Sequence, residues 1–129
     1  MTLTANDLVA DAHARIRQVC ATQLNASDDS ARVLIDVREP GEYAEGHLPG
    51  AINLPRGVLE FKIEAHPALA CSTSPALADR QRPIVLYCLS GGRSALAADS
   101  LQRLGFKDVQ SLTGGIVAWR DAGLPLTAE

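Results

Sequence analysis

The sequence is poor in cysteine. It has three, Cys20, Cys71 and Cys88, which are widely spaced and include no C-x-x-C pair. A small, odd set of this kind excludes a disulfide framework, and without the ligand spacing of a zinc site we expect no metal. Unpaired thiols suit a reducing environment, so we expect the protein to be cytoplasmic.

The chain also lacks a basic cluster and a long apolar run. Its formal net charge at pH 7 is −3, which argues against nucleic acid or an anionic membrane as the main partner. The amino terminus carries Asp7 and Asp11 in place of the basic and apolar segments of an export signal, and no stretch approaches the length of a membrane span. The sequence indicates a soluble, unexported protein that attracts any anion through local groups.

What is present is enough for one domain. With 129 residues, 47% of them hydrophobic, the chain can bury a single core. Apolar runs alternate with helical patterns, which predicts an α/β fold around a mainly parallel sheet. We expect strands at 32–37, 84–88 and 106–112, a turn that runs into a short strand within 46–54, and helices through 58–63 and from 94 to 104.

This pattern divides the chain into three segments. Residues 1–32 are expected to form a helical extension, because apolar residues recur on one helical face from Leu8 to Val19. That face would suit packing on the chain's own domain or on another subunit. Residues 33–125 would form the domain, and residues 126–129 a frayed tail.

The most informative stretch runs from Ile84 to Ser94. Its first five residues, ending at Cys88, suit a strand buried on both faces, and the pattern turns helical from Ser94. Cys88 is therefore expected at the carboxyl end of a strand, facing a helix amino terminus. Backbone N–H groups from Leu89 to Ser94 would make a concave anion site there and stabilise a thiolate.

The residues of this loop favour a reactive cysteine. Gly91 and Gly92 allow positive φ and a close approach of the backbone to a ligand. The helix dipole alone stabilises an anion near the helix amino terminus by about 0.3–1 kcal/mol, and Arg93 adds a full positive charge to it. The alternative is an inert buried thiol followed by an ordinary turn.

Charged residues also follow the strand at 32–37. Asp36, Arg38 and Glu39 stand where ligands gather in open α/β sheets, outside the carboxyl ends of strands. Asp36 would act either in the site or as a structural acceptor that holds loop N–H groups. Arg56 is a candidate second cation near the anion site, with an ordinary surface arginine as the alternative.

Three other residues have simpler interpretations. His47, in a turn with glycine and proline, is expected to hydrogen-bond locally. Cys71 would resolve an oxidised Cys88 only if its Ser/Thr/Pro-rich segment folded over the site, and the close geometry that thiol pairs demand disfavours this. Trp119, the single tryptophan, is expected in the core.

Four ordered motifs resemble the rhodanese family of sulfurtransferases. They span about Val33 to Pro125 and comprise the segments Leu34–Pro40, Glu42–Tyr43 with Gly46–Asn53, Tyr87–Ser94 and Leu112–Trp119. The resemblance implies a rhodanese-like α/β domain, with a central, mainly parallel sheet of about five strands flanked by helices on both faces, as such folds allow.

The resemblance also implies a mechanism. Cys88 would take the outer sulfur of a donor such as thiosulfate as a persulfide and pass it to cyanide, a small thiol or a thiol protein. These two half-reactions predict ping-pong kinetics without a metal or organic cofactor. Arg93 would bind the donor oxyanion, and Asp36 and Arg38 would support the loop. The substrate-binding residues would be Leu89, Ser90, Gly91, Gly92, Arg93 and Ser94.

Two alternatives come from the same resemblance. A cysteine phosphatase or arsenate reductase shares the fold, but such phosphatases place one more residue between cysteine and arginine than the four present here, Leu89 to Gly92. A narrower ring of N–H groups favours a single sulfur atom over a phosphate group. A non-catalytic module that recruits a partner protein is the other alternative, and the retained Cys88 and Arg93 argue against it.

Overall fold

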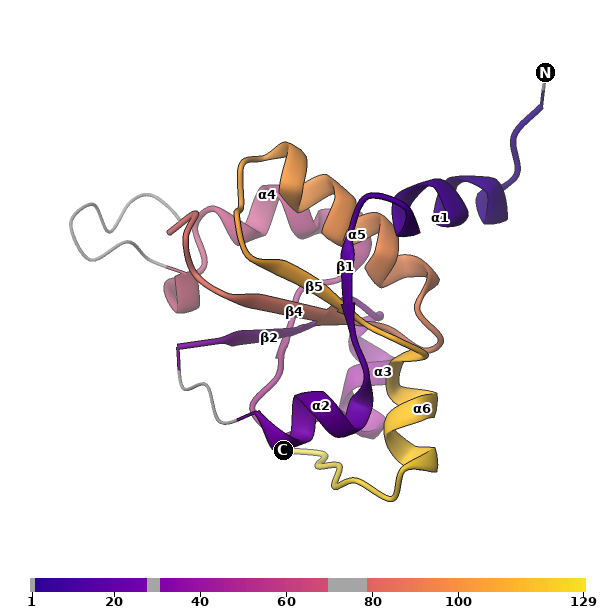
Figure 1. The fold of residues 1–129 in the computed structure, drawn as a ribbon. Coiled ribbons are helices and arrows are strands. Elements are labelled where there is room, and N and C mark those ends of the chain that lie inside the picture. Colours follow the sequence, from indigo (N-terminus) through magenta and orange to yellow (C-terminus); the bar gives the residue numbers. More distant parts are fainter. Residues whose placement is uncertain (1, 28–30, 70–78) are drawn as a thin grey trace.

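The computed structural model describes residues 2–27, 31–69 and 79–129. Its centre is a five-stranded, all-parallel sheet with the strand order β1-β5-β4-β2-β3 (Figure 1). The strands are β1 (Arg17–Val19), β2 (Val33–Asp36), β3 (Ile52–Asn53), β4 (Ile84–Tyr87) and β5 (Val109–Leu112). The predicted α/β fold with a parallel sheet is confirmed.

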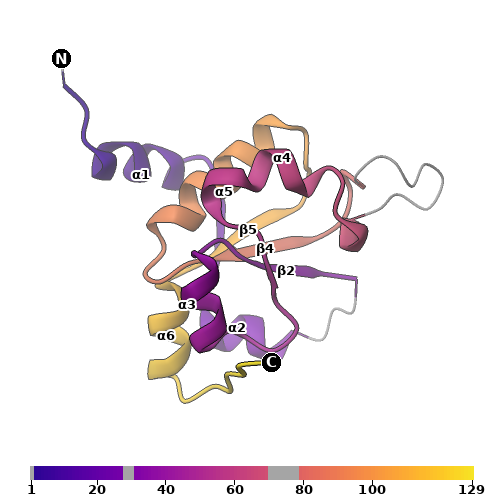
Figure 2. The same cartoon turned by 180° about the vertical axis from the view of Figure 1, so that it is seen from behind.

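Helices cover both faces of this sheet (Figures 1 and 2). One face carries α1 (Ala5–His13), α4 (Leu59–Ile63) and α5 (Gly92–Arg103), and the other carries α2 (Ala21–Ala26), α3 (Pro40–Glu45) and α6 (Gly115–Asp121). Two short 3₁₀ helices, η1 (Arg56–Val58) and η2 (Pro67–Leu69), flank α4. Each face therefore has its own hydrophobic core.

The central strand β4 shows why the cores form. All four of its residues are buried, and successive side chains point to opposite faces of a sheet. Ile84 and Leu86 pack in the core beneath α4 and α5, whereas Val85 and Tyr87 pack in the core beside α2 and α6. An uninterrupted apolar run is what a strand covered on both sides requires.

The amino-terminal segment differs from the helical extension predicted for residues 1–32. Helix α1 begins with the capping box of Thr4 and Asp7 but ends at His13, and the chain then enters the sheet as β1. This edge strand pairs in parallel with β5, and the Thr113 N–H donates to the Val19 carbonyl at 2.9 Å. The backbone groups along β5 would otherwise lack partners, so pairing overrides the helical pattern of the sequence.

The carboxyl-terminal residues 126–129, predicted to fray, are instead attached to the domain. Thr127 and His47 form an isolated antiparallel bridge, with N–H···O distances of 2.8 and 2.9 Å. Just before it, the indole N–H of Trp119 donates to the Pro125 carbonyl at 2.7 Å. Trp119 is buried, as predicted, and it anchors the tail.

The segment between β3 and β4 follows the prediction of a helix near 58–63, which the structure gives as α4. Cys71 and the connection around it lie outside the described residues. Within the ranges that the structure describes, every helix is too short or too polar to cross a membrane.

Candidate active site

Cys88 follows β4 directly and lies at the amino end of α5. Cys88 is only 1% exposed to solvent. Its backbone carbonyl accepts a hydrogen bond from the Ile116 N–H at 2.9 Å, and the Leu89 carbonyl accepts one from the Val117 N–H at 3.2 Å. The start of α6 thus holds the start of the loop. Only glycine fits at position 115, where φ is +60° and a Cβ would lie 2.5 Å from both carbonyl oxygens.

The sulfur of Cys88 faces an amide and a hydroxyl. The Gly91 N–H donates to Sγ at 3.1 Å, and Sγ lies 3.6 Å from Ser94 Oγ. Ser94 Oγ is also within 2.8 Å of Ser111 Oγ and 3.3 Å of the Gly91 carbonyl. A buried polar cluster therefore surrounds one side of the sulfur, although the thiol also belongs to the core beneath α5.

The glycine at the start of α5 sets this geometry. Gly91 is the N-cap and has φ +114°, a conformation that L side chains rarely adopt. Among the described residues, the amides of Gly92, Arg93 and Ser94 in the first helical turn have no protein acceptor. Such amides and the positive end of a helix of this length make an anion site.

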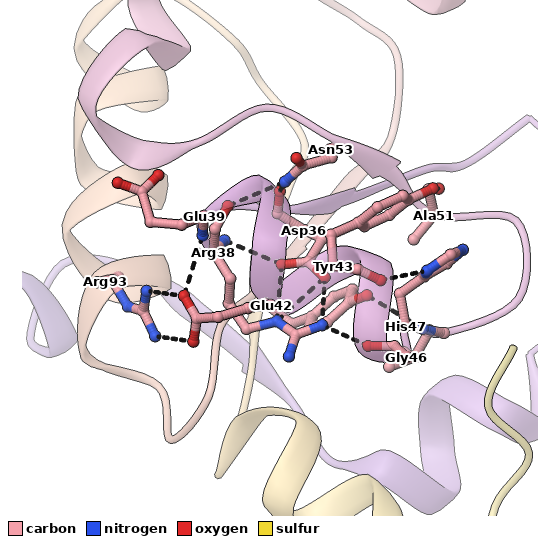
Figure 3. A network of polar contacts seen from close by, with 12 residues as sticks. Asp36, Arg38, Glu39, Glu42, Tyr43, Gly46, His47, Ala51, Asn53 and Arg93 are labelled. Atoms are coloured by element: carbon pink, nitrogen blue, oxygen red, sulfur yellow. Dashed lines mark hydrogen bonds and ion pairs between the residues drawn. The ribbon is translucent and has the colours of Figure 1, made fainter. Parts of the chain in front are cut away.

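Arg93 does not stand alone in the loop. Its Nη1 and Nη2 donate to the two carboxylate oxygens of Glu42 at 2.8 and 3.2 Å, in a bidentate pair between α5 and α3 (Figure 3). The hydrogen bonds from Arg93 lower the pKa of Glu42 from 4.5 to about 2. Glu42 was not among the site residues expected from the sequence, which held no signal that it would meet Arg93.

Asp36 and Arg38 form a buried pair below this contact. Arg38 Nη2 donates to Asp36 Oδ2 at 2.7 Å and to the Gly46 carbonyl at 2.7 Å, and the side chains are 0% and 3% exposed (Figure 3). The Asn53 amide donates to the carbonyls of Asp36 and Arg38 at 3.0 and 2.9 Å. These contacts brace the turn that leads into α3, and through α3 they position Glu42.

His47 is structural, as expected from the sequence. It is 2% exposed, its Nδ1 lies 2.8 Å from the Tyr43 carbonyl, and its ring stacks on the Tyr43 ring with centroids 3.7 Å apart. Tyr43 in turn donates to the Ala51 carbonyl at 2.6 Å (Figure 3). This cluster fixes the end of α3.

Arg56 is engaged elsewhere. Its Nη1 lies 3.1 Å from both carboxylate oxygens of Glu60, and its Nη2 donates to Ser100 Oγ at 3.2 Å. These contacts tie η1 to α4 and α5, so the structure gives Arg56 no contact with Cys88. Among the described residues, no group of three His, Cys, Asp or Glu side chains is placed to hold a metal ion.

Comparisons with known proteins agree with this architecture. A family model for the rhodanese-like domain matches residues 20–122. A sulfurtransferase of Allochromatium vinosum is 34% identical over 79% of this chain and 84% of its own length. The thiosulfate sulfurtransferase GlpE of Stutzerimonas stutzeri is 31% identical over 81% of this chain and 84% of its own.

A solved structure extends the match to the amino terminus. It is a protein of unknown function from Rhodopseudomonas palustris, described as a possible tyrosine phosphatase, with 33% identity and a TM-score of 0.80. The match covers 98% of this chain and 96% of that one. The family match begins at residue 20, earlier than the boundary at residue 33 expected from the sequence.

Proposed function

The chain belongs to the rhodanese-like family, and we propose that it is a sulfurtransferase in which Cys88 carries the transferred sulfur. In the first half-reaction, the Cys88 thiolate attacks the outer sulfur of thiosulfate. A bond forms between the two sulfur atoms, the S–S bond of thiosulfate breaks, and sulfite leaves with the electron pair. In the second, a thiophilic acceptor removes that sulfur and Cys88 leaves as the thiolate.

The observation that carries the proposal is the 3.1 Å contact from the Gly91 N–H to Cys88 Sγ. An amide that donates to sulfur stabilises the thiolate relative to the thiol. The amides at the first turn of α5 are available for the outer sulfur of a persulfide, which is also an anion. Preorganised donors of this kind stabilise charge that develops during a reaction.

Arg93 keeps a role in donor binding despite its pair with Glu42. A guanidinium has five N–H donors, and Glu42 engages two of the nitrogen atoms. The remaining donors of Arg93 would bind the sulfonate oxygens of thiosulfate. The pair with Glu42 fixes the direction in which they point.

Mass spectrometry of the intact protein tests the proposal. Incubation with thiosulfate should add one sulfur atom, and cyanide should then remove it. Cys88→Ser should gain no sulfur, whereas Cys20→Ser should gain it as the unchanged protein does, because Cys20 is an exposed thiol capping α2. Absence of the gain in the unchanged protein would refute the proposal.

The same samples address the two alternatives. A phosphatase, the activity suggested for the Rhodopseudomonas palustris protein, would hydrolyse an aryl phosphate, while a recruiting module would neither gain sulfur nor release phosphate. The four residues between Cys88 and Arg93 favour sulfur, since they leave a narrow ring of amides.

A further inference from the structure

Ser111 brings a hydroxyl into the hydrophobic core beneath α5. It lies two residues after Val109 on β5, so the two side chains point to the same face of the sheet. Val109 packs in the hydrophobic core of that face, and Ser111 is only 1% exposed. A buried hydroxyl is unfavourable unless it has a hydrogen-bond partner, so the identity of that partner matters.

The partner of Ser111 is Ser94, which lies on α5 beside the sulfur of Cys88. The two hydroxyl oxygens are 2.8 Å apart, and among the described residues this is the only hydrogen bond of the Ser111 side chain. Ser94 Oγ has two further neighbours, the Gly91 carbonyl at 3.3 Å and Cys88 Sγ at 3.6 Å. Ser94 is 0% exposed and Cys88 is 1% exposed, so bulk water takes no part in these contacts.

The directions of the hydroxyl protons follow from counting donors and acceptors. A serine hydroxyl has one proton to donate and can accept two hydrogen bonds. Buried polar groups rarely go without a partner, so Ser111 donates to Ser94, which is the acceptor within its reach. The proton of Ser94 is then available for the Gly91 carbonyl or for Cys88 Sγ.

The protonation state of Cys88 decides between these two acceptors. A thiol donates its own proton to Ser94, and the Ser94 proton then points to the Gly91 carbonyl. A thiolate can only accept, so the Ser94 proton turns to the sulfur, which also accepts the Gly91 N–H at 3.1 Å. The Gly91 carbonyl keeps a partner in both states, because it accepts the Ala95 N–H at 3.1 Å as well.

We propose that Ser111 is a positioning residue for Cys88. By donating to Ser94, it holds that hydroxyl between its two acceptors. It also polarises the Ser94 hydroxyl, which makes Ser94 a stronger donor to the Cys88 thiolate. This inference rests on the proposed sulfurtransferase function and adds a residue of β5 to the groups that act on the sulfur.

The two half-reactions should respond to Ser111 in opposite directions. In the first, the Cys88 thiolate is the nucleophile, and stabilising a thiolate lowers its intrinsic nucleophilicity. In the second, Cys88 is the leaving group, and a more stable thiolate leaves faster. Where the thiolate is fully formed, Ser111 therefore speeds the release of sulfur from Cys88 and slows its uptake.

The pH dependence of thiolate formation tests the path through Ser94. In a background in which Cys20 and Cys71 are serine, the ultraviolet absorbance of the Cys88 thiolate is followed against pH, with Cys88→Ser as the blank. The midpoint should rise by roughly 0.5 pH unit in Ser94→Ala, as expected for the loss of one hydrogen bond. It should rise by about 0.2 pH unit in Ser111→Ala, which weakens that bond without removing it. The double replacement should match Ser94→Ala, because Ser111 acts only through Ser94.

Ser100→Ala is the matched control. Ser100 is also a partly buried serine of α5, but its hydroxyl accepts from Arg56 Nη2 at 3.2 Å and has no contact with Cys88. Its replacement should leave the midpoint unchanged. An unchanged midpoint in Ser111→Ala would overturn the proposal. So would a double replacement whose midpoint lies above that of Ser94→Ala, because Ser111 would then act on the sulfur without Ser94.

The separate half-reactions give a second readout. At a pH above all the midpoints, sulfur uptake from thiosulfate and its removal by cyanide are timed by intact mass. The ratio of the removal rate to the uptake rate should fall in Ser111→Ala and fall further in Ser94→Ala. Equal slowing of both steps would overturn the positioning role, because the replacement would then only loosen the loop. If the unchanged protein takes up no sulfur, the proposed function fails, and the midpoints alone decide the role of Ser111.

Discussion

Arg93 and Glu42 meet through two hydrogen bonds although 51 residues separate them in the sequence. The pair joins the loop after Cys88 to α3, and the buried pair of Asp36 and Arg38 braces the turn before that helix. The orientation of the Arg93 guanidinium therefore depends on Glu42 and, through α3, on the residues at the end of β2. Four predictions follow from this and from the packing around the loop.

The first concerns Arg93. Arg93→Ala should lower kcat/KM for thiosulfate about tenfold, because hydrogen bonds to a charged group contribute about 1.5–3 kcal/mol and each 1.4 kcal/mol is a factor of ten. Arg93→Lys should recover only part of the loss, since it cannot donate in a bidentate fork. Steady-state kinetics at several thiosulfate concentrations check this, and an unchanged kcat/KM in Arg93→Ala would be inconsistent with donor binding by Arg93.

The second concerns acid stability. The pKa of Glu42 is lowered from 4.5 to about 2 by Arg93, so the folded state holds its proton less tightly than the unfolded state does. The contribution of the pair is thus complete above pH 4.5 and is lost as the pH falls towards 2. Solvent screening reduces the free energy that this ion pair adds to stability, because both side chains are about one-third exposed.

Thermal unfolding as a function of pH measures this effect. The difference in Tm between the unchanged protein and Glu42→Gln should be largest above pH 4.5 and should shrink towards pH 2. Glu64→Gln, which alters a peripheral pair with Arg80 at 3.3 Å, serves as a control. A Tm difference that is constant across this range would show that Glu42 stabilises by some means other than its charge.

The third concerns the buried serines beside the sulfur. Ser94→Ala leaves the Ser111 hydroxyl without its partner at 2.8 Å, and an unsatisfied buried hydroxyl costs about 1–3 kcal/mol. Replacing both serines with alanine should cost less than the sum of the two single replacements. Urea unfolding of the four proteins in this double-mutant cycle supplies the comparison, and strict additivity would argue against a coupled pair.

Ser94 should also affect the thiol itself. Its hydroxyl lies 3.6 Å from Cys88 Sγ, so Ser94→Ala should change the rate at which Cys88 reacts with iodoacetamide. Cys20 would obscure this measurement, because it is exposed and the hydrogen bond from Thr22 lowers its pKa. The experiment therefore needs a background in which Cys20 and Cys71 are serine.

The fourth concerns Gly115. In Gly115→Ala, the Cβ would lie 2.5 Å from the carbonyl oxygens of Cys88 and Leu89, at a φ of +60°. Backbone strain of this kind and overpacking each cost roughly 1–3 kcal/mol, so the free energy of unfolding should fall by about 2 kcal/mol or more. Sulfur uptake should fall too, because the first peptides of the loop must move.

Gly41→Ala is the matched control for this change. Gly41 lies in α3, where a Cβ would meet nothing within 4 Å. Alanine is the better helix former by about 1 kcal/mol, so this variant should be as stable as the unchanged protein or more so. Similar losses for both glycines in urea unfolding would contradict the packing described around Cys88.

Much of the fold follows from local pattern. The strands at 33–36 and 84–87 come from largely apolar runs that the sheet buries on both faces, and the helix after Gly91 shows the helical spacing of its apolar residues. Strand β1 leaves no comparable pattern in the sequence, because it has only three residues at an edge of the sheet and is stabilised by pairing with β5, a tertiary effect. The same reason explains the tail, where Thr127 pairs with His47.

The site was predictable in part. Cys88, Gly91 and Arg93 lie within one contiguous loop, so their proximity is a consequence of sequence spacing. The partners that complete the site come from elsewhere: Glu42 from α3 and Ser111 from β5. Contacts between side chains of distant elements depend on how those elements pack together. The patterns in a single sequence do not predict that packing.

The bridge between His47 and Thr127 has a practical consequence for work at the bench. It places Leu126 in the wall of a cavity of about 320 Å³ that is also lined by Glu42 and Leu89, and Glu129 follows only a few residues later. An affinity tag fused after Glu129 would crowd this cavity, and a loss of activity caused by the tag would be wrongly attributed to the loop beside it. The opposite terminus projects away from the sheet (Figure 1), so purification handles and fluorophores belong there.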